Sequence, residues 1–187
     1  MTSQISVLVC GARGCGKTSL IRRITEKKFL TGSNSSSGVQ EAITTVKTAD
    51  GEKVRIHFRE ERIEDYIPCS RNVYTHVDVY IIVYDISNQI SLTSVKYNCD
   101  MVRSKMRSLK DSVIIVGTKC DLKREIQLAD IEGYANSEDV AHIKTSSLTN
   151  TNVNEMLMLL LSRKFPKTEK RNSNVKTTEK SSCCVIT

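Results

Sequence analysis

The sequence predicts an α/β fold, in which an open, mostly parallel central sheet carries helices on both faces. Short apolar runs typical of buried strands occur at 5–10, 77–84 and 113–117. Segments whose apolar residues recur at helical spacing follow or separate them, at 18–28, 92–109, 127–136 and 151–164. Strands that alternate with helices require right-handed crossovers, which place the strands side by side in one sheet.

Two more strands are predicted over 39–48 and 53–58. The Asp50-Gly51 pair lies between them, and Asp-Gly between two such runs is a strong hairpin signal. The preceding segment, 30–38, has the composition of a loop, and 59–75 is highly charged and contains a proline.

The chain of 187 residues fits one domain and a tail. With 39% hydrophobic residues it has enough apolar surface for a packed core. Helical periodicity stops after 165, so we expect a domain at 1–165 and a flexible tail at 166–187. Residues 162–187 carry seven basic side chains against two acidic ones, which suits an anionic membrane or nucleic acid.

Several classes of protein are excluded at this stage. The apolar runs are much shorter than the roughly 20 residues that span a bilayer, and the N-terminus does not have the pattern of a signal peptide. The seven cysteines and three histidines show no metal-ligand spacing. We therefore expect reduced thiols and a cytosolic domain.

Residues 11–18 carry the strongest motif. They read Gly-Ala-Arg-Gly-Cys-Gly-Lys-Thr and fit G-x-x-x-x-G-K-[ST] between a predicted strand and a predicted helix. The glycines let successive backbone N–H groups point at phosphate oxygens, and the helix N-terminus adds its positive dipole end. Lys17 is expected at the β- and γ-phosphates and the Thr18 hydroxyl on Mg²⁺. The fold class becomes that of a three-layer P-loop NTPase.

The base is indicated by Thr118-Lys119-Cys120-Asp121, directly after the strand at 113–117. A carboxylate accepts hydrogen bonds from both N1–H and the 2-amino group of guanine, whereas adenine has no such pair. Ligands of open α/β sheets bind at the carboxyl ends of the strands, where Asp121 is placed. We find no adenine site or phosphate-acceptor site of an ATP-dependent kinase.

With these motifs the chain resembles the Ras superfamily of small GTPases, and its Rab branch most closely, over about residues 4–187. The resemblance implies binding of GTP or GDP with Mg²⁺. It places Phe29 at the guanine edge, and it places Thr145-Ser146-Ser147 in a second base-contacting loop whose N–H groups meet the guanine O6. The implied nucleotide-binding residues are Gly11, Arg13, Gly14, Cys15, Gly16, Lys17, Thr18, Ser19, Phe29, Ser36, Thr118, Lys119, Asp121, Leu122, Ser146, Ser147 and Leu148.

Some of these positions depart from the family pattern. Ser147 and Leu148 stand where the family usually has Ala and Lys, and the loss of that lysine weakens the base pocket. Thr118 replaces the usual Asn, as in the Rho branch. Ser36 takes the place of the first-switch threonine whose hydroxyl reaches Mg²⁺ when a γ-phosphate is present, or it is one of several loop serines.

The second switch departs furthest. The family has Asp-x-x-Gly-Gln after its third strand, whereas 59–65 reads Arg-Glu-Glu-Arg-Ile-Glu-Asp. Counting forward from the hairpin turn aligns the motif with Glu60, Ile63 and Glu64. Counting back from the following strand aligns it with Arg59, Arg62 and Ile63. Neither alignment contains the glycine or the glutamine.

Arg13 and Glu64 are the candidate catalytic residues. Glu64 in the glutamine position would bring a negative charge close to the γ-phosphate, which opposes catalysis. The Arg13 guanidinium either crowds the γ-phosphate or acts as an arginine finger in cis. We favour crowding, and we expect guanine nucleotide to bind while intrinsic hydrolysis is very slow or absent.

Partner recognition is also altered. Two aromatic positions of the effector patch in similar Rab proteins hold Glu41 and Arg59, which leaves Tyr74 at the third. Either the effectors differ from those of ordinary Rab proteins and are unknown, or these residues are simply a solvated charged face.

The chain ends Cys183-Cys184-Val185-Ile186-Thr187, which has C-a-a-X form and also resembles a Rab double-geranylgeranylation end. Farnesyl and geranylgeranyl both remain open. One lipid chain binds a membrane only marginally, and the basic tail supplies a second signal, so an anionic membrane is favoured over nucleic acid. The implied partners are a prenyltransferase and a chaperone of the GDP-dissociation-inhibitor type. We expect a cytosolic pool and a pool on the cytoplasmic face of a membrane.

These observations predict a Rab-like guanine-nucleotide switch in vesicle traffic. The alternative is a pseudo-GTPase scaffold or interaction module whose bound nucleotide is structural.

Overall fold

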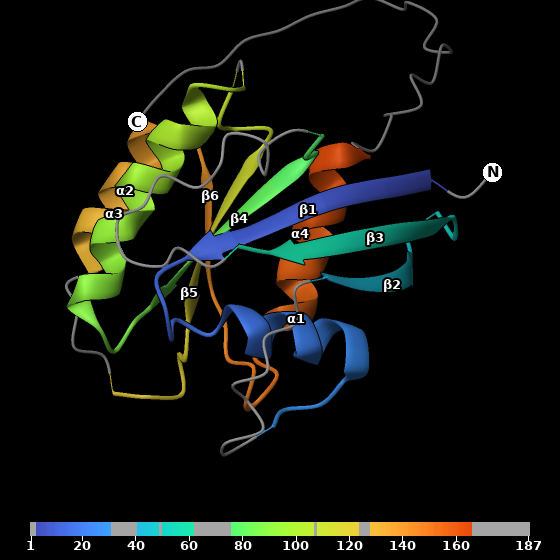
Figure 1. Cartoon of the computed structure of the whole chain (residues 1–187), viewed down its shortest axis with the longest axis horizontal. Helices are drawn as coiled ribbons and strands as arrows, with labels where there is room; N and C mark the ends of the chain where they lie inside the picture. The colour runs from blue at the N-terminus through green and yellow to red at the C-terminus, as the bar shows by residue number, and fades with distance from the viewer. Residues whose placement is uncertain are drawn as a thin grey trace, which may run out of the picture.

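A computed structural model describes residues 3–30, 41–48, 50–61, 76–106, 108–123 and 128–165. In chain order the elements are β1 (Ser3–Gly11), α1 (Lys17–Glu26), β2 (Glu41–Lys47), β3 (Lys53–Glu60), β4 (Val79–Asp85), α2 (Gln89–Arg103), β5 (Val113–Thr118), α3 (Leu128–Ser137), β6 (Ala141–Lys144) and α4 (Val153–Lys164). Figure 1 shows the strands as one twisted sheet between helices.

The sheet has six strands in the order β2-β3-β1-β4-β5-β6. Only the β2–β3 pair is antiparallel, and the other four pairs are parallel. Helices α1 and α4 cover one face, and α2 and α3 cover the other (Figure 1). The predicted fold class, a mostly parallel sheet with helices on both faces, is confirmed.

The central strand β1 shows why the sheet needs two layers of helices. Ile5, Val7 and Val9 are fully buried against α1 and α4, while Leu8 and Cys10 are fully buried against α2 and α3. Successive side chains of a strand point to opposite faces, so a strand that is apolar at every position must be covered twice. The whole carboxyl edge of the sheet is thereby fixed in space.

Several element boundaries differ from the sequence prediction. Helix α2 begins earlier than predicted because the Asn88 side chain accepts a hydrogen bond from the Ile90 N–H and caps the helix. Strand β3 continues to Glu60, which pairs with Val9 of β1. Strand β6 was missed, because the alternation of Ala-His-Ile-Lys covers only four residues and all of them are half-buried.

Some predictions fall outside the described residues. These are the first-switch Ser36, the catalytic candidate Glu64, the aromatic Tyr74, the tail at 166–187 and the lipidation candidates Cys183 and Cys184. Among the described segments, no helix is long and apolar enough to cross a membrane.

Candidate nucleotide-binding site

The loop after β1 turns sharply into α1. Gly11 has a φ of 145°, and a Cβ atom at this position would lie 2.1 Å from the Val83 carbonyl oxygen, so only glycine fits. The Lys17 side chain is 5% exposed, and its Nζ donates hydrogen bonds to the carbonyl oxygens of Gly11 (2.8 Å) and Ala12 (2.9 Å). The loop therefore curls around its own lysine ammonium group.

The carboxyl end of β3 reaches the first turn of α1. The Thr18 hydroxyl lies 2.7 Å and 2.8 Å from the two carboxylate oxygens of Glu60 and donates to them. Glu60 is the residue that one of the two alignments of the second switch puts at the family aspartate, and this contact fits that alignment. Two hard oxygen donors thus lie side by side at the start of α1.

Thr118 joins the phosphate loop to the end of β5. Its hydroxyl donates to the carbonyl oxygens of Cys15 and Tyr84, the latter at 2.9 Å. The Thr118 side chain also fills the space beside Gly16, where a Cβ atom would lie 3.3 Å from the hydroxyl oxygen. Threonine therefore bridges the phosphate loop and the strand from the position where the family usually has asparagine.

The next residues of this turn contact the loop after β6. The Ser146 hydroxyl donates to the Asp121 carboxylate. The Ser146 N–H donates to the Thr151 carbonyl oxygen (3.0 Å), and the Cys120 N–H donates to the Thr145 carbonyl oxygen (3.1 Å). The two segments predicted to contact the base are therefore adjacent, although 25 residues separate Asp121 from Ser146 in the chain.

An ion pair holds the lysine of the same turn. Lys119 Nζ lies 2.6 Å from Asp85 Oδ2, and Asp85 also accepts hydrogen bonds from the backbone N–H (2.9 Å) and hydroxyl (2.7 Å) of Ser87. Burial acts to raise the pKa of the Asp85 carboxyl, but the bonds from Lys119 and Ser87 outweigh it and lower that pKa below its ordinary value. Asp85 therefore stays ionised at neutral pH and holds the Lys119 ammonium group.

Comparison with known proteins assigns the chain. The sequence profile of the Ras family matches residues 6–165, which is most of the chain. The chain belongs to the Ras family. Ras-related protein Rab-30 of Homo sapiens is 27% identical to it over 160 residues, covering 84% of this chain and 78% of the relative. The Rab-30 proteins of Bos taurus and Mus musculus match to the same extent.

This protein is therefore a Ras-superfamily small GTPase near the Rab branch. Ras-family GTPases in general bind GTP or GDP with Mg²⁺.

The remaining site predictions fall around the same carboxyl edge of the sheet. Arg13 and Gly14 are exposed in the phosphate loop, Cys15 is buried, and Ser19 and Phe29 are half-buried. Burial raises the pKa of the Cys15 thiol, so this side chain stays neutral close to the phosphate loop. Leu122 and Leu148 are 48% and 51% exposed on the two base-contacting loops.

Two residues of this Ras-family site were missed in the sequence. Asp85 is the last residue of the buried strand β4, where a polar residue can indicate a ligand site, but its partner Lys119 lies 34 residues away. Arg23 of α1 contacts the loop after β6, and nothing in a basic helix face distinguishes it from a solvated residue. Both assignments required the tertiary structure.

The two residues predicted to replace aromatic positions of the effector patch, Glu41 and Arg59, lie on neighbouring strands. Glu41 of β2 lies directly opposite Arg59 of β3 in the antiparallel register. Glu41 Oε2 also lies 3.3 Å from the His57 Nε2, so polar side chains of β2 and β3 contact one another here.

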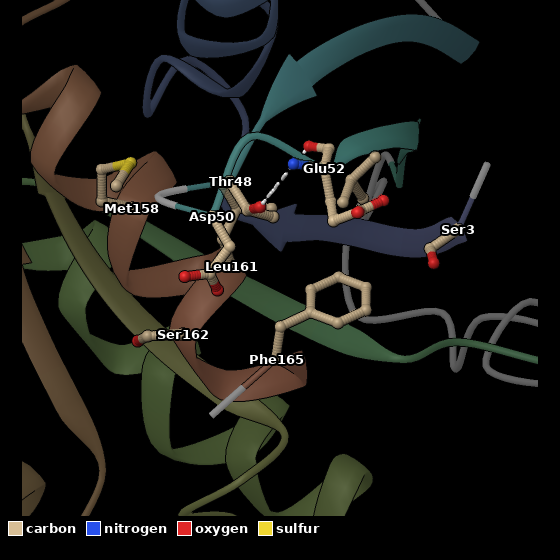
Figure 2. A pocket seen from close by; sticks show the side chains of 9 residues that line it. Ser3, Thr48, Asp50, Glu52, Met158, Leu161, Ser162 and Phe165 are labelled. Carbon is tan, nitrogen blue, oxygen red and sulfur yellow. Dashed lines mark hydrogen bonds between the residues drawn. The ribbon is translucent and has the colours of Figure 1, made fainter. Parts of the chain in front are cut away.

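A separate hollow of about 180 Å³ lies at the other end of the sheet (Figure 2). The β2–β3 turn and the end of α4 form it, with Asp50 and Glu52 at its rim and Leu161 and Phe165 among its apolar lining residues. Ser3, at the start of β1, also lines this hollow, whereas the phosphate loop follows the end of that strand, about 26 Å away along it. The hollow is therefore distinct from the nucleotide site.

Proposed function

We propose that this protein binds GTP or GDP at the carboxyl edge of its sheet, with residues 11–18 around the phosphates and Asp121 at the guanine. The observation that carries the proposal is the Thr118 hydroxyl bridge. It ties the carbonyl oxygen of Cys15 in the phosphate loop to the strand that leads into Lys119 and Asp121. One ligand with a phosphate end and a purine end fits two such segments held at a fixed spacing.

Mg²⁺ fits the oxygen donors at the start of α1. Mg²⁺ prefers hard oxygen ligands, and the Thr18 hydroxyl and the Glu60 carboxylate lie within 2.7 Å of each other. Thr18 and Glu60 would hold the ion, and Ser36 would join them by resemblance to the first switch. When bound, Mg²⁺ neutralises negative charge on the phosphate oxygens.

We propose that GTP hydrolysis is very slow or absent. The alignment that begins at Glu60 supports this: it puts Ile63 and Glu64 where the family has glycine and glutamine, so a carboxylate would replace the water-orienting amide. The same observation supports the second candidate function, a pseudo-GTPase scaffold whose nucleotide is structural. The nucleotide that copurifies distinguishes the two: retained GTP favours the scaffold, and multiple turnovers favour a switch.

Membrane attachment is the third part of the proposal. Cys183 and Cys184 lie at the end of a tail with a strong excess of basic residues, and a prenyl group and a basic segment together give stable binding to an anionic surface. A prenyltransferase would modify the tail, and a chaperone of the GDP-dissociation-inhibitor type would maintain a cytosolic pool. We place the protein on the cytoplasmic face of a membrane in vesicle traffic, with effectors that remain to be found.

The nucleotide proposal is tested by calorimetry on folded protein stripped of nucleotide. We expect GDP and GTP each to bind in magnesium buffer, while ADP and ATP bind about 10⁴-fold more weakly because adenine leaves the Asp121 carboxylate unpaired. Circular dichroism establishes that the stripped protein is folded. No binding heat with either guanine nucleotide would contradict the proposal.

The membrane proposal is tested with Cys183→Ser and Cys184→Ser in the full chain. We expect the double variant to move from the membrane fraction to the cytosol, because basic residues alone give about 1 kcal/mol each near an anionic surface. A Cys120→Ser variant serves as the control for loss of a thiol. A double variant that stays as membrane-bound as the parent protein would rule out the lipid anchor.

A further inference from the structure

Arg23, in the last turn of α1, reaches across to the loop after β6. Its Nε donates to the Ser147 carbonyl oxygen at 2.6 Å, and its Nη2 donates to the Leu148 carbonyl oxygen at 3.0 Å. Its Nη1 donates to the Lys27 carbonyl oxygen at 3.1 Å, which ties the same guanidinium to the end of its own helix. Each guanidinium nitrogen thus binds a backbone carbonyl, and the planar group cross-links two segments more than 120 residues apart.

In the described part of the chain, few other contacts fix the loop after β6 on the side that faces Arg23. Leu148 is 51% exposed, so packing of its side chain contributes little. On the opposite side, the Ser146 hydroxyl donates to Asp121 and accepts a hydrogen bond from the Thr149 N–H at 3.1 Å. The loop is therefore held between a carboxylate of the base site and the guanidinium of Arg23.

The carbonyl contacts orient peptide groups as well as holding the chain. A trans peptide is planar, and its N–H points opposite to its C=O. Since Arg23 binds the Ser147 carbonyl, the N–H of Leu148 in the same peptide group is directed away from Arg23. A cation on the carbonyl oxygen also polarises the peptide and makes this N–H a stronger donor.

We propose that Arg23 is a positioning residue for the guanine site: by binding the carbonyl oxygens of Ser147 and Leu148, it holds in place the loop whose residues 145–147 are expected to meet the guanine O6. This inference rests on the proposed guanine-nucleotide function. Arg23 does not contact the nucleotide itself, and its effect is confined to the base end of the ligand. It takes over part of the support that Leu148 cannot give in place of the usual lysine.

The test compares a ligand that has a base with one that does not. Affinities for GDP and for inorganic tripolyphosphate, both with Mg²⁺, are measured by calorimetry for the full chain and for Arg23→Met. We expect GDP to bind about 10- to 100-fold more weakly to Arg23→Met, since two charge-assisted hydrogen bonds are lost. Tripolyphosphate should change by less than about twofold, because the phosphate loop is untouched.

Two further variants keep the test decisive. Arg23→Lys retains the charge but cannot bind two carbonyls in a plane, so we expect an intermediate GDP affinity. Lys28→Met removes a positive charge just beyond α1 and should leave both affinities unchanged. If Arg23→Met does not fold, the Arg23→Lys variant carries the same comparison.

Hydrogen exchange gives a readout that needs no nucleotide. We expect the amides of residues 147–149 to exchange faster in Arg23→Met than in the parent protein, with the amides of β1 unchanged. Equal loss of GDP and tripolyphosphate affinity would show that Arg23 supports the whole domain, and unchanged GDP affinity would show that it has no role; either overturns the inference. If the parent protein binds neither ligand, it is the proposed function that fails.

Discussion

Asp121→Asn is expected to lower the affinity for GDP by about 10³- to 10⁴-fold and to raise the affinity for xanthosine diphosphate. The aspartate carboxylate accepts from both N1–H and the 2-amino group of guanine. An asparagine amide presents one acceptor and one donor, which match N1–H and the 2-oxo group of xanthine. Calorimetry with both diphosphates in magnesium buffer measures the change.

The fold should tolerate this substitution, because the Asn side-chain oxygen can still accept the hydrogen bond from the Ser146 hydroxyl. Asp130→Asn, an exposed residue in the first turn of α3, is a matched control with the same change of charge and should bind GDP as the parent does. Unchanged guanine selectivity in Asp121→Asn would remove Asp121 from the site.

Single-turnover GTP cleavage by this protein is expected to be slower than about 10⁻⁴ s⁻¹, the order of magnitude of intrinsic hydrolysis by Ras. On the alignment that begins at Glu60, Glu64 takes the glutamine position, where we expect its charge to oppose attack on the γ-phosphate. The combined change Ile63→Gly and Glu64→Gln removes this charge and restores the water-orienting amide. We expect it to raise the rate about 10²-fold, measured as release of phosphate from preloaded protein.

Arg13→Ala separates the two roles considered for Arg13. The side chain is exposed in the phosphate loop. If it crowds the γ-phosphate, the substitution leaves the slow rate unchanged or raises it. A parent protein that cleaves GTP at the ordinary family rate, and loses that activity in Arg13→Ala, would instead identify an arginine finger in cis and contradict the proposed loss of hydrolysis.

The phosphate loop was predictable because all of its information is local. Residues 11–18 are contiguous, a buried strand precedes them and a helix follows, and each of these features is visible in a short window of sequence. The alternation of apolar strands and amphipathic helices gave the fold class in the same way. Strand β6 was missed because its four half-buried residues are too few for their alternation to distinguish a strand from a loop.

The alignment of the second switch could not be predicted from the local sequence. Counting along the sequence left two alignments open, because each count began from a different element and loop lengths between elements vary. The pairing of β3 with β1, in which Glu60 lies beside Val9, brings the Glu60 carboxylate to the Thr18 hydroxyl. Strand register is a pairwise property of two distant segments, so counting along the sequence could not show that Glu60 lies beside Thr18.

The sequence by itself determined the fold class, the phosphate loop and the residue expected to select guanine, since each depends on a pattern within one strand, loop or helix. Only the tertiary structure decided which side chains support them: Glu60 at Thr18, Asp85 at Lys119, and Arg23 at the loop of Ser147 and Leu148. The physical reason is that hydrogen bonds and ion pairs act over about 3 Å in space, whatever the separation along the chain. Packing of the sheet between two layers of helices sets those distances.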